Sequence, residues 1–237
     1  MKRKLLLFIL RSFLVSSGYA QGVRLPVVLE GQQHDNWCWA ASLSMAIKYY
    51  IPAQRANTQL QCQLVTDKIS PSPATAASCK CCEMPKKNDK CTFIKTPNGP
   101  CLPCTLPLPV SYNPNGSPNW SETIGIVDRL LRLYGLRTDI IKVGRGALAT
   151  IKARLAVNDL ILGIYAGGGY HVSLISGYEV VAGETLLFVN NPLYQPKATC
   201  TGCFHVIKTN AKGENALAIS EYAGTYTSQL FIVIHKP

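Results

Sequence analysis

Helical spacing of apolar residues dominates the chain up to residue 156. Residues 37–50 have a largely apolar body without Pro or Gly, which predicts a buried helix. Asp35 and Asn36 come directly before this helix and suit its N-cap, and Pro52 is expected to end it. The same reasoning predicts further helices over residues 57–68, 120–136 and 146–156, the second of them stopped by Gly135.

From residue 160 onward the pattern changes to short runs of β-branched and aromatic residues, separated by Gly or Asn-Pro breaks. Such runs predict β-strands. They cover residues 160–165, 171–178, 185–189, 203–208 and 229–235. Because helices come first and strands second, the pattern predicts an α+β fold in which a helical half packs against a β half.

A long segment interrupts this pattern. Residues 71–118 hold ten of the fifteen prolines and six of the ten cysteines, with little apolar periodicity. A loop of this length is uncommon in a compact domain unless something holds it together. We therefore expect an irregular insertion that is stabilised by cross-links.

The first twenty residues have the three-part pattern of a secretory signal peptide. Three basic residues at positions 2–4 precede a short apolar run, and small residues lead up to Ala20. The run is too short, and too interrupted by Arg11, to span a bilayer as a helix. We expect cleavage after Ala20, export as a secreted or periplasmic protein, and one domain over residues 21–237. The alternative is a basic amphipathic start that stays on the protein.

Charge narrows the choice of partners. Four of the 24 basic residues belong to residues 1–20, so the remaining chain carries a net charge of +7 instead of +11. The other basic residues are scattered, apart from a modest cluster over residues 80–95, and no nucleic-acid-binding motif accompanies them. This pattern indicates a solvated basic surface and predicts no nucleic-acid partner and no membrane partner after removal of the signal peptide. It leaves the oligomeric state open.

Ten cysteines in an exported chain usually form disulfides. If one thiol is kept free for chemistry, nine remain, so a second free thiol or an intermolecular bond must account for the odd one. Cys101 with Cys104 and Cys200 with Cys203 also have the spacing of a four-cysteine zinc site. Cys200 and Cys203 could instead bridge each other. Disulfides are the preferred interpretation, and we expect no metal and no organic cofactor.

Residues 32–41 (QQHDNWCWAA) carry the strongest candidate for chemistry. A cysteine in the first turn of a buried helix, here Cys38, has its thiolate favoured by the positive end of the helix. Backbone N–H groups at the helix start can donate to an oxyanion, and the side-chain amide of an upstream glutamine can supply a second donor. Such a nucleophile still needs a base from elsewhere in the fold. The alternative is an ordinary buried or disulfide-bonded cysteine.

His171 is the best candidate for that base, and His34, His205 and His235 are weaker ones. It opens a strand-like run directly after Gly167-Gly168-Gly169-Tyr170, and the glycines would let a substrate backbone approach closely. The residue that orients the imidazole is expected at the end of the next strand, at residues 190–191 (NN). An asparagine carbonyl can accept from the ring N–H and so select the tautomer. The alternative for His171 is an ordinary strand histidine with satisfied hydrogen bonds.

Taken in order, these residues resemble the papain-like cysteine protease superfamily over most of residues 27–195. The motifs that carry the resemblance are Gln32 six residues before Cys38-Trp39-Ala40-Ala41, the glycine-rich run before His171-Val172, and Asn191-Pro192 after a strand. Residues 36–41 (NWCWAA), 59–62 (QLQC) and 81–82 (CC) resemble in particular the bacterial branch that includes avirulence-type effector proteases. That branch commonly has Asp-Pro where this chain has Asn-Pro, and asparagine is the papain-type choice.

The resemblance implies a papain-like fold, with the catalytic cysteine at the N-terminus of a buried helix that packs on a C-terminal antiparallel β half. It implies Cys38 as the nucleophile, His171 as general base and acid, Asn191 as the orienting residue and Gln32 as the oxyanion donor. The choice between Asn191 and its neighbour Asn190 stays open at this point.

The function expected from these roles is an exported cysteine peptidase that hydrolyses peptide bonds in a protein or peptide substrate through an acyl-enzyme. Trp37 and Gly169 are expected to contact that substrate, although tryptophans in such positions more often pack. One alternative is an amidase, deamidase or transpeptidase that acts on cell-wall peptides or glutamine side chains. The other is a non-catalytic, cysteine-rich binding module on the same scaffold.

Overall fold

The computed structural model describes residues 22–34, 36–69, 95–96, 99–100, 107–109, 111–116, 118–141, 146–166, 170–181, 184–193, 208–209, 215–218 and 228–237. Several expectations fall outside these residues: the signal peptide, most of the insertion over 71–118, the N-cap residue Asp35, the substrate contact Gly169 and most of the strand over 203–208. They stay predictions.

The predicted first helix is confirmed as α2 (Cys38–Tyr50), which is buried along almost its whole length. It ends before Pro52, where the short 3₁₀ helix η1 (Pro52–Gln54) begins. The prediction that Asn36 caps α2 is wrong. Trp37 holds the cap position without a side-chain cap hydrogen bond, and Asn36 has a φ of 61°. Asparagine tolerates this left-handed conformation, so Asn36 turns the chain into the helix instead of capping it.

The three other predicted helices are also present, with shifted ends. They are α3 (Leu60–Ile69), α4 (Ser121–Arg132) and α5 (Ala147–Ala156). The helix α4 is shorter than predicted because the chain leaves it one turn before Gly135, which has a φ of 70°. Glycine enters this left-handed region without strain, which makes it a common residue after a helix end.

An antiparallel sheet forms the second half of the fold. Its strand order is β10-β11-β9-β8-β7-β12-β6, and β1 pairs with β8 outside this path. The strands are β1 (Gly22–Arg24), β6 (Arg137–Ile141), β7 (Leu160–Ala166), β8 (Tyr170–Val181), β9 (Glu184–Asn190), β10 (Lys208–Thr209), β11 (Asn215–Ala218) and β12 (Ser228–His235). Two small sheets pair β2 (Lys95–Thr96) with β3 (Gly99–Pro100), and β4 (Ser111–Tyr112) with β5 (Pro118–Asn119).

The predicted strands β7, β8, β9 and β12 are confirmed, whereas the sequence does not predict β1, β6 or β11. These three are short, and their extended conformation depends on partners that lie far along the chain. The strand β6 is largely exposed, so it lacks the alternation that identifies a half-buried strand. It forms because β12 pairs with it, with Ile141 opposite Phe231.

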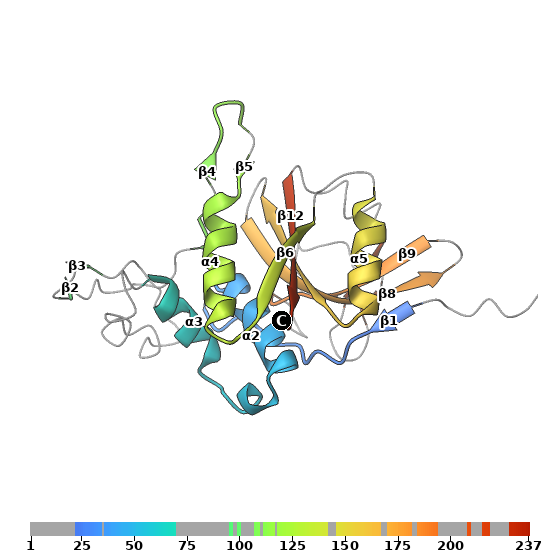
Figure 1. Ribbon diagram of the computed structural model, residues 1–237, viewed down its shortest axis with the longest axis horizontal. Helices are drawn as coiled ribbons and strands as arrows, with labels where there is room; N and C mark the ends of the chain where they lie inside the picture. The colour runs from blue at the N-terminus through green and yellow to red at the C-terminus, as the bar shows by residue number, and fades with distance from the viewer. Residues whose placement is uncertain are drawn as a thin grey trace, which may run out of the picture.

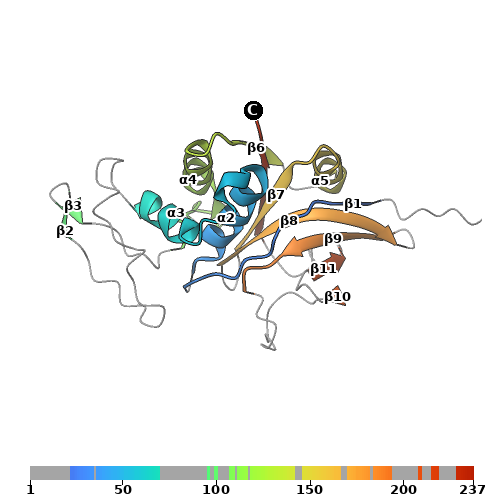
Figure 2. The same ribbon diagram turned by 90° about the horizontal axis from the view of Figure 1, so that it is seen from below.

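Helices and sheet form a mixed α+β architecture. Helices α2, α4 and α5 lie on one side of the sheet, and β8, β9 and β11 curve along the other side of the molecule (Figures 1 and 2). The helix α2 packs directly on β8, where the Ser42 hydroxyl donates to the Val172 carbonyl at 3.3 Å. The hydrophobic core is therefore centred on α2 and the central strands.

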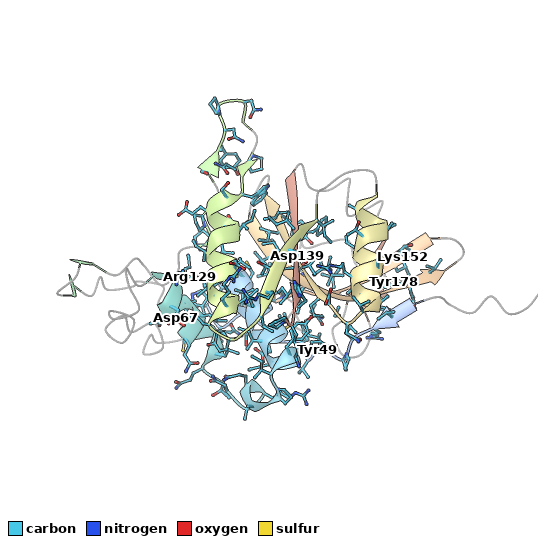
Figure 3. All side chains as sticks on the ribbon, viewed as in Figure 1. Tyr49, Asp67, Arg129, Asp139, Lys152 and Tyr178 are labelled. Atoms are coloured by element: carbon cyan, nitrogen blue, oxygen red, sulfur yellow. The ribbon has the colours of Figure 1, made fainter. Side chains whose placement is uncertain are left out.

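Polar contacts hold the helices in place around this core. Arg129 Nη1 on α4 donates to the Asp67 carbonyl on α3 at 3.2 Å, and the Lys152 ammonium on α5 lies 5.1 Å from the centre of the Tyr178 ring on β8 (Figure 3). Exposed contacts of this kind contribute about 1 kcal/mol or less each to the free energy of unfolding. They orient the helices on a scaffold that burial of apolar surface already stabilises.

The strand β8 accepts β1 at close range because residue 177 is glycine. A Cβ on Gly177 would lie 2.3 Å from the Val23 carbonyl oxygen, closer than real Cβ atoms come. Beyond β1 the contact continues, since the Leu25 N–H donates to the Ser176 carbonyl at 2.8 Å. The N-terminal strand therefore runs along β8 and delivers the chain to the loop that contains Gln32.

Candidate active site

Cys38 is the first residue of α2 and is 3% exposed. Burial raises the pKa of its thiol, and the backbone N–H groups of Val172, Trp39 and Cys38 itself interact with the sulfur and oppose this shift in part. Two of these donors belong to the start of the helix and the third to β8. The helix start and the strand therefore meet at the Cys38 sulfur, and Val172 directly follows the predicted base.

His171 lies on β8, buried, and is paired with Asn191 just beyond the end of β9. The distance from His171 Nε2 to Asn191 Oδ1 is 3.0 Å. The backbone N–H of Leu193 also lies 3.0 Å from the same oxygen. Because a backbone N–H can only donate, the atom between them must be the carbonyl oxygen of the amide.

That assignment also selects the tautomer of His171. An amide oxygen can only accept, so Nε2 carries the hydrogen and Nδ1 of the neutral ring keeps its lone pair. A histidine in this tautomer can take a proton at Nδ1. The predicted orienting role of Asn191 thus has a geometric basis in these two hydrogen bonds.

Asn190, the other candidate, points elsewhere. Its Nδ2 donates to the Ser176 hydroxyl at 2.8 Å, on the far part of β8. Its register explains the difference, because Asn190 pairs with Leu174 and shares that residue's face of the sheet, whereas His171 faces the other way. The structure therefore brings Asn191, and not Asn190, to His171.

Burial is the main influence on the pKa values of Cys38 and His171. It raises the pKa of the Cys38 thiol to about 11, against the smaller lowering by the backbone N–H groups. It lowers the pKa of His171 to about 4, and the hydrogen bond to Asn191 opposes this shift only in part. The helix start favours the thiolate as expected, since the Trp39 and Cys38 N–H groups lower the pKa, but burial has the larger effect in the opposite direction. Desolvation of the charged forms is the largest cause of both shifts, and it favours the neutral thiol and the neutral imidazole.

Gln32 is held by its backbone next to the orienting residue. Its N–H donates to the Pro192 carbonyl at 3.0 Å, one residue after Asn191. Its Oε1 atom is buried without a hydrogen-bond partner among the described residues. The loop that contains Gln32 and the turn after β9 are thus joined directly, and the amide of Gln32 is partly withdrawn from solvent.

Sequence reasoning misses two members of this arrangement, the Val172 N–H and the Pro192 carbonyl. Backbone groups have no residue type that a pattern could reveal. The available signal is adjacency, since each group follows a predicted residue, His171 in one case and Asn191 in the other.

Trp37 differs from its predicted role as a substrate contact. Its side chain is 0% exposed and packs edge-on against the His34 ring, with centroids 4.4 Å apart. A side chain with no exposed surface offers none to a substrate in this conformation. Trp37 therefore serves as packing at the start of α2.

The described part of the chain contains two cysteines. Cys38 has a free thiol, and Cys62 on α3 is disulfide-bonded. Within these residues, no group of three or more His, Cys, Asp or Glu side chains is placed to hold a metal ion. The four cysteines of the alternative zinc site lie outside the described residues, so that alternative and the full disulfide pattern are untested.

Among the residues that the structure describes, no helix is long and apolar enough to cross a membrane. A comparison with protein-family models finds no match to the chain, and a comparison with curated proteins finds none either. The resemblance to papain-like proteases therefore depends on the residues and the geometry described above.

Proposed function

We propose that the protein is an exported cysteine peptidase with a papain-like fold, which hydrolyses peptide bonds through Cys38, His171 and Asn191. The observation that carries the proposal is the double acceptance by Asn191 Oδ1. It leaves the base nitrogen Nδ1 of His171 with a lone pair on a residue whose neighbour, Val172, hydrogen-bonds the nucleophile sulfur. A free thiol at Cys38 further favours an enzyme over a disulfide-rich binding module.

The reaction starts from a neutral pair. His171 Nδ1 accepts the Cys38 proton as the sulfur attacks the peptide carbonyl, so the imidazolium and the oxyanion form together as the C–S bond forms. The Gln32 side-chain amide and the Cys38 backbone N–H donate to the oxyanion, and each such donor contributes about 3 kcal/mol. His171 then returns the proton to the leaving amine. Water, deprotonated by the same imidazole, releases the acyl group from sulfur.

Active-site labelling tests this proposal without a known substrate. The oxidatively folded protein is treated with an epoxysuccinyl-type thiol inhibitor, and the modified residue is located by peptide mass spectrometry. We expect labelling at Cys38 that is lost in His171→Ala. A Cys38 that is unlabelled, or labelled equally fast without His171, would contradict the proposal.

Substrate assays then separate the peptidase from the alternative acyl-transfer enzymes. Casein and peptidoglycan fragments are compared side by side, and the products are identified by mass spectrometry. Cleavage of casein that disappears in Cys38→Ala supports the peptidase. Release of ammonia or exchange of an amine, without cleavage of casein, would instead identify an amidase, deamidase or transpeptidase.

A further inference from the structure

A second glutamine, Gln61 on α3, contacts the loop around Gln32 from the side of the helices. Its side chain is buried, at 3% exposure. Gln61 Nε2 donates to the Gly31 carbonyl at 3.0 Å, and Gln61 Oε1 accepts from the Gln33 N–H at 3.1 Å. One planar amide thus bonds to the residues on both sides of Gln32.

The loop is held at two further points. The Gln33 side chain donates to the Thr58 carbonyl at 3.0 Å, just before α3, and the Gln32 N–H donates to the Pro192 carbonyl. Gln32 thus lies between α3 and the turn after β9. Of these contacts, only the Gln61 amide reaches both neighbours of Gln32.

We propose that Gln61 is a positioning residue for the oxyanion donor, which holds the Gln32 backbone where its side-chain amide can meet the reacting carbonyl. This inference rests on the proposed function. Glutamine suits the task because one side chain supplies a donor and an acceptor in a fixed plane. Glutamate lacks the donor while ionised, and methionine of similar size lacks both groups.

The chemistry of an oxyanion site makes such positioning important. Donors stabilise the transition state only when they are already aimed at the oxygen that becomes charged. A displacement of about 1 Å at such a site can lower the rate about 10²-fold. Loss of Gln61 is therefore expected to act on steps that form an oxyanion, and not on the reactivity of the thiol itself.

Two probes of Cys38 separate these effects. Iodoacetamide alkylates sulfur by displacing iodide, with formation of a C–S bond, transfer of the thiol proton to His171 and no oxyanion. p-Nitrophenyl acetate acylates the same sulfur through a tetrahedral oxyanion and releases p-nitrophenolate. The ratio of acylation rate to alkylation rate cancels the titration of Cys38 and His171 and reports the oxyanion site.

We expect Gln61→Met to lower this ratio about tenfold or more, with the alkylation rate unchanged. Gln32→Ala should lower it about 10²-fold, and Gln61→Met should lower it no further in that background. The matched control is Gln63→Met on the same helix, which removes an exposed side chain that, among the described residues, accepts a hydrogen bond only from Asn57 Nδ2, at 2.9 Å. That control should leave both rates unchanged.

A second variant keeps the test decisive if Gln61→Met fails to fold. Gln61→Glu preserves shape and the acceptor for the Gln33 N–H, and its carboxyl can donate to the Gly31 carbonyl only when protonated. The acylation-to-alkylation ratio of this variant should rise towards the wild-type value as the pH falls, while the wild-type ratio stays flat. Circular dichroism of each variant verifies the fold.

The outcomes are distinct. Equal losses in acylation and alkylation, or losses from Gln61→Met and Gln32→Ala that multiply in the double variant, would overturn the positioning role and leave the proposed function standing. A wild-type Cys38 that reacts no faster than Cys38 in His171→Ala would overturn the proposed function, and this inference with it.

Discussion

Cys38 and Gln32 reach the candidate site from one stretch of seven residues at the start of α2, whereas His171 and Asn191 come from the two strands β8 and β9 and the turn that follows. On the helix side, the short stretch of chain between Gln32 and Cys38 limits the distance between them, and the Gln61 amide bonds to the residues on both sides of Gln32. On the sheet side, the pairing register sets the distance between the two residues. The two sides meet where the Val172 N–H bonds to the Cys38 sulfur and where the Gln32 N–H bonds to the Pro192 carbonyl.

The sheet side depends on an irregularity in that register. Gly177 pairs with Phe188, and a regular continuation from there would place Leu174 opposite Asn191. A bulge at Ser176 moves the pairing by one residue, so that Leu174 lies opposite Asn190. Since a shift of one residue exchanges the two faces of a strand, the bulge gives Asn191 the face of His171.

The largest expected effect is a fall in the rate of peptide cleavage when the proposed base is removed. Removal of His171 leaves the Cys38 thiol, with a pKa of about 11, without an acceptor for its proton. We expect His171→Ala to lower the rate of casein cleavage by about 10³-fold to 10⁴-fold. His235→Ala, a histidine on β12 beside Asp139, serves as the control and should leave the rate unchanged. Equal losses in both variants would indicate damage to the sheet instead of loss of a base.

The next effect is on stability in acid. Burial lowers the pKa of His171 to about 4, from 6.5 in the unfolded chain. Between these values the unfolded chain binds the proton and the folded chain does not, so this contribution to stability is complete above pH 6.5 and declines as the pH falls to 4. The expected loss is about 3 kcal/mol. Urea unfolding of wild type and His171→Gln at pH 7 and pH 4 isolates it, and identical losses in both proteins would contradict it.

A smaller effect is expected from replacing the two asparagines, Asn191 on catalysis and Asn190 on stability. Asn191→Ala removes the acceptor that orients His171, and we expect kcat to fall about 10-fold to 10²-fold because the imidazole tautomer and angle are no longer selected. Asn190→Ala breaks the bond to Ser176 and should cost about 1 kcal/mol of unfolding free energy with little change in kcat. Steady-state kinetics and urea unfolding of both variants measure the two quantities. The reverse result would show that the bulge does not select the active asparagine.

The smallest expected effect is on the free energy of unfolding, and it comes from Tyr50 at the C-terminal end of α2. The Tyr50 hydroxyl donates to the Ile234 carbonyl at 2.6 Å and accepts from the Leu160 N–H at 2.9 Å, joining the end of the helix to β12 and β7. Tyr50→Phe leaves both groups without a partner in the core, at an expected cost of about 1–3 kcal/mol. Because Cys38 lies at the opposite end, its alkylation rate should not change. A slower alkylation would mean that the whole helix, and not only its start, tunes the nucleophile.

The sequence predicts much of the fold and most of the candidate site. The apolar pattern locates all four described α-helices, and it locates the strands β7, β8, β9 and β12 because these are apolar, β-branched runs bounded by turn residues. It does not locate β1, β6 or β11, whose extended conformation depends on distant partners. It names Cys38, His171 and Gln32 through residue type and order, but the N-cap of α2 and the role of Trp37 are predicted incorrectly.

By itself, therefore, the sequence determined the helices, the longer strands and the candidate side chains of the site, since these depend on local composition and spacing. Only the tertiary structure decided which asparagine serves His171, because that depends on a bulge in the pairing of two strands. It also decided the direction in which the pKa values of Cys38 and His171 shift. Burial is a property of the packed fold, and desolvation at Cys38 and His171 outweighs the local effects of the helix start and the hydrogen bonds.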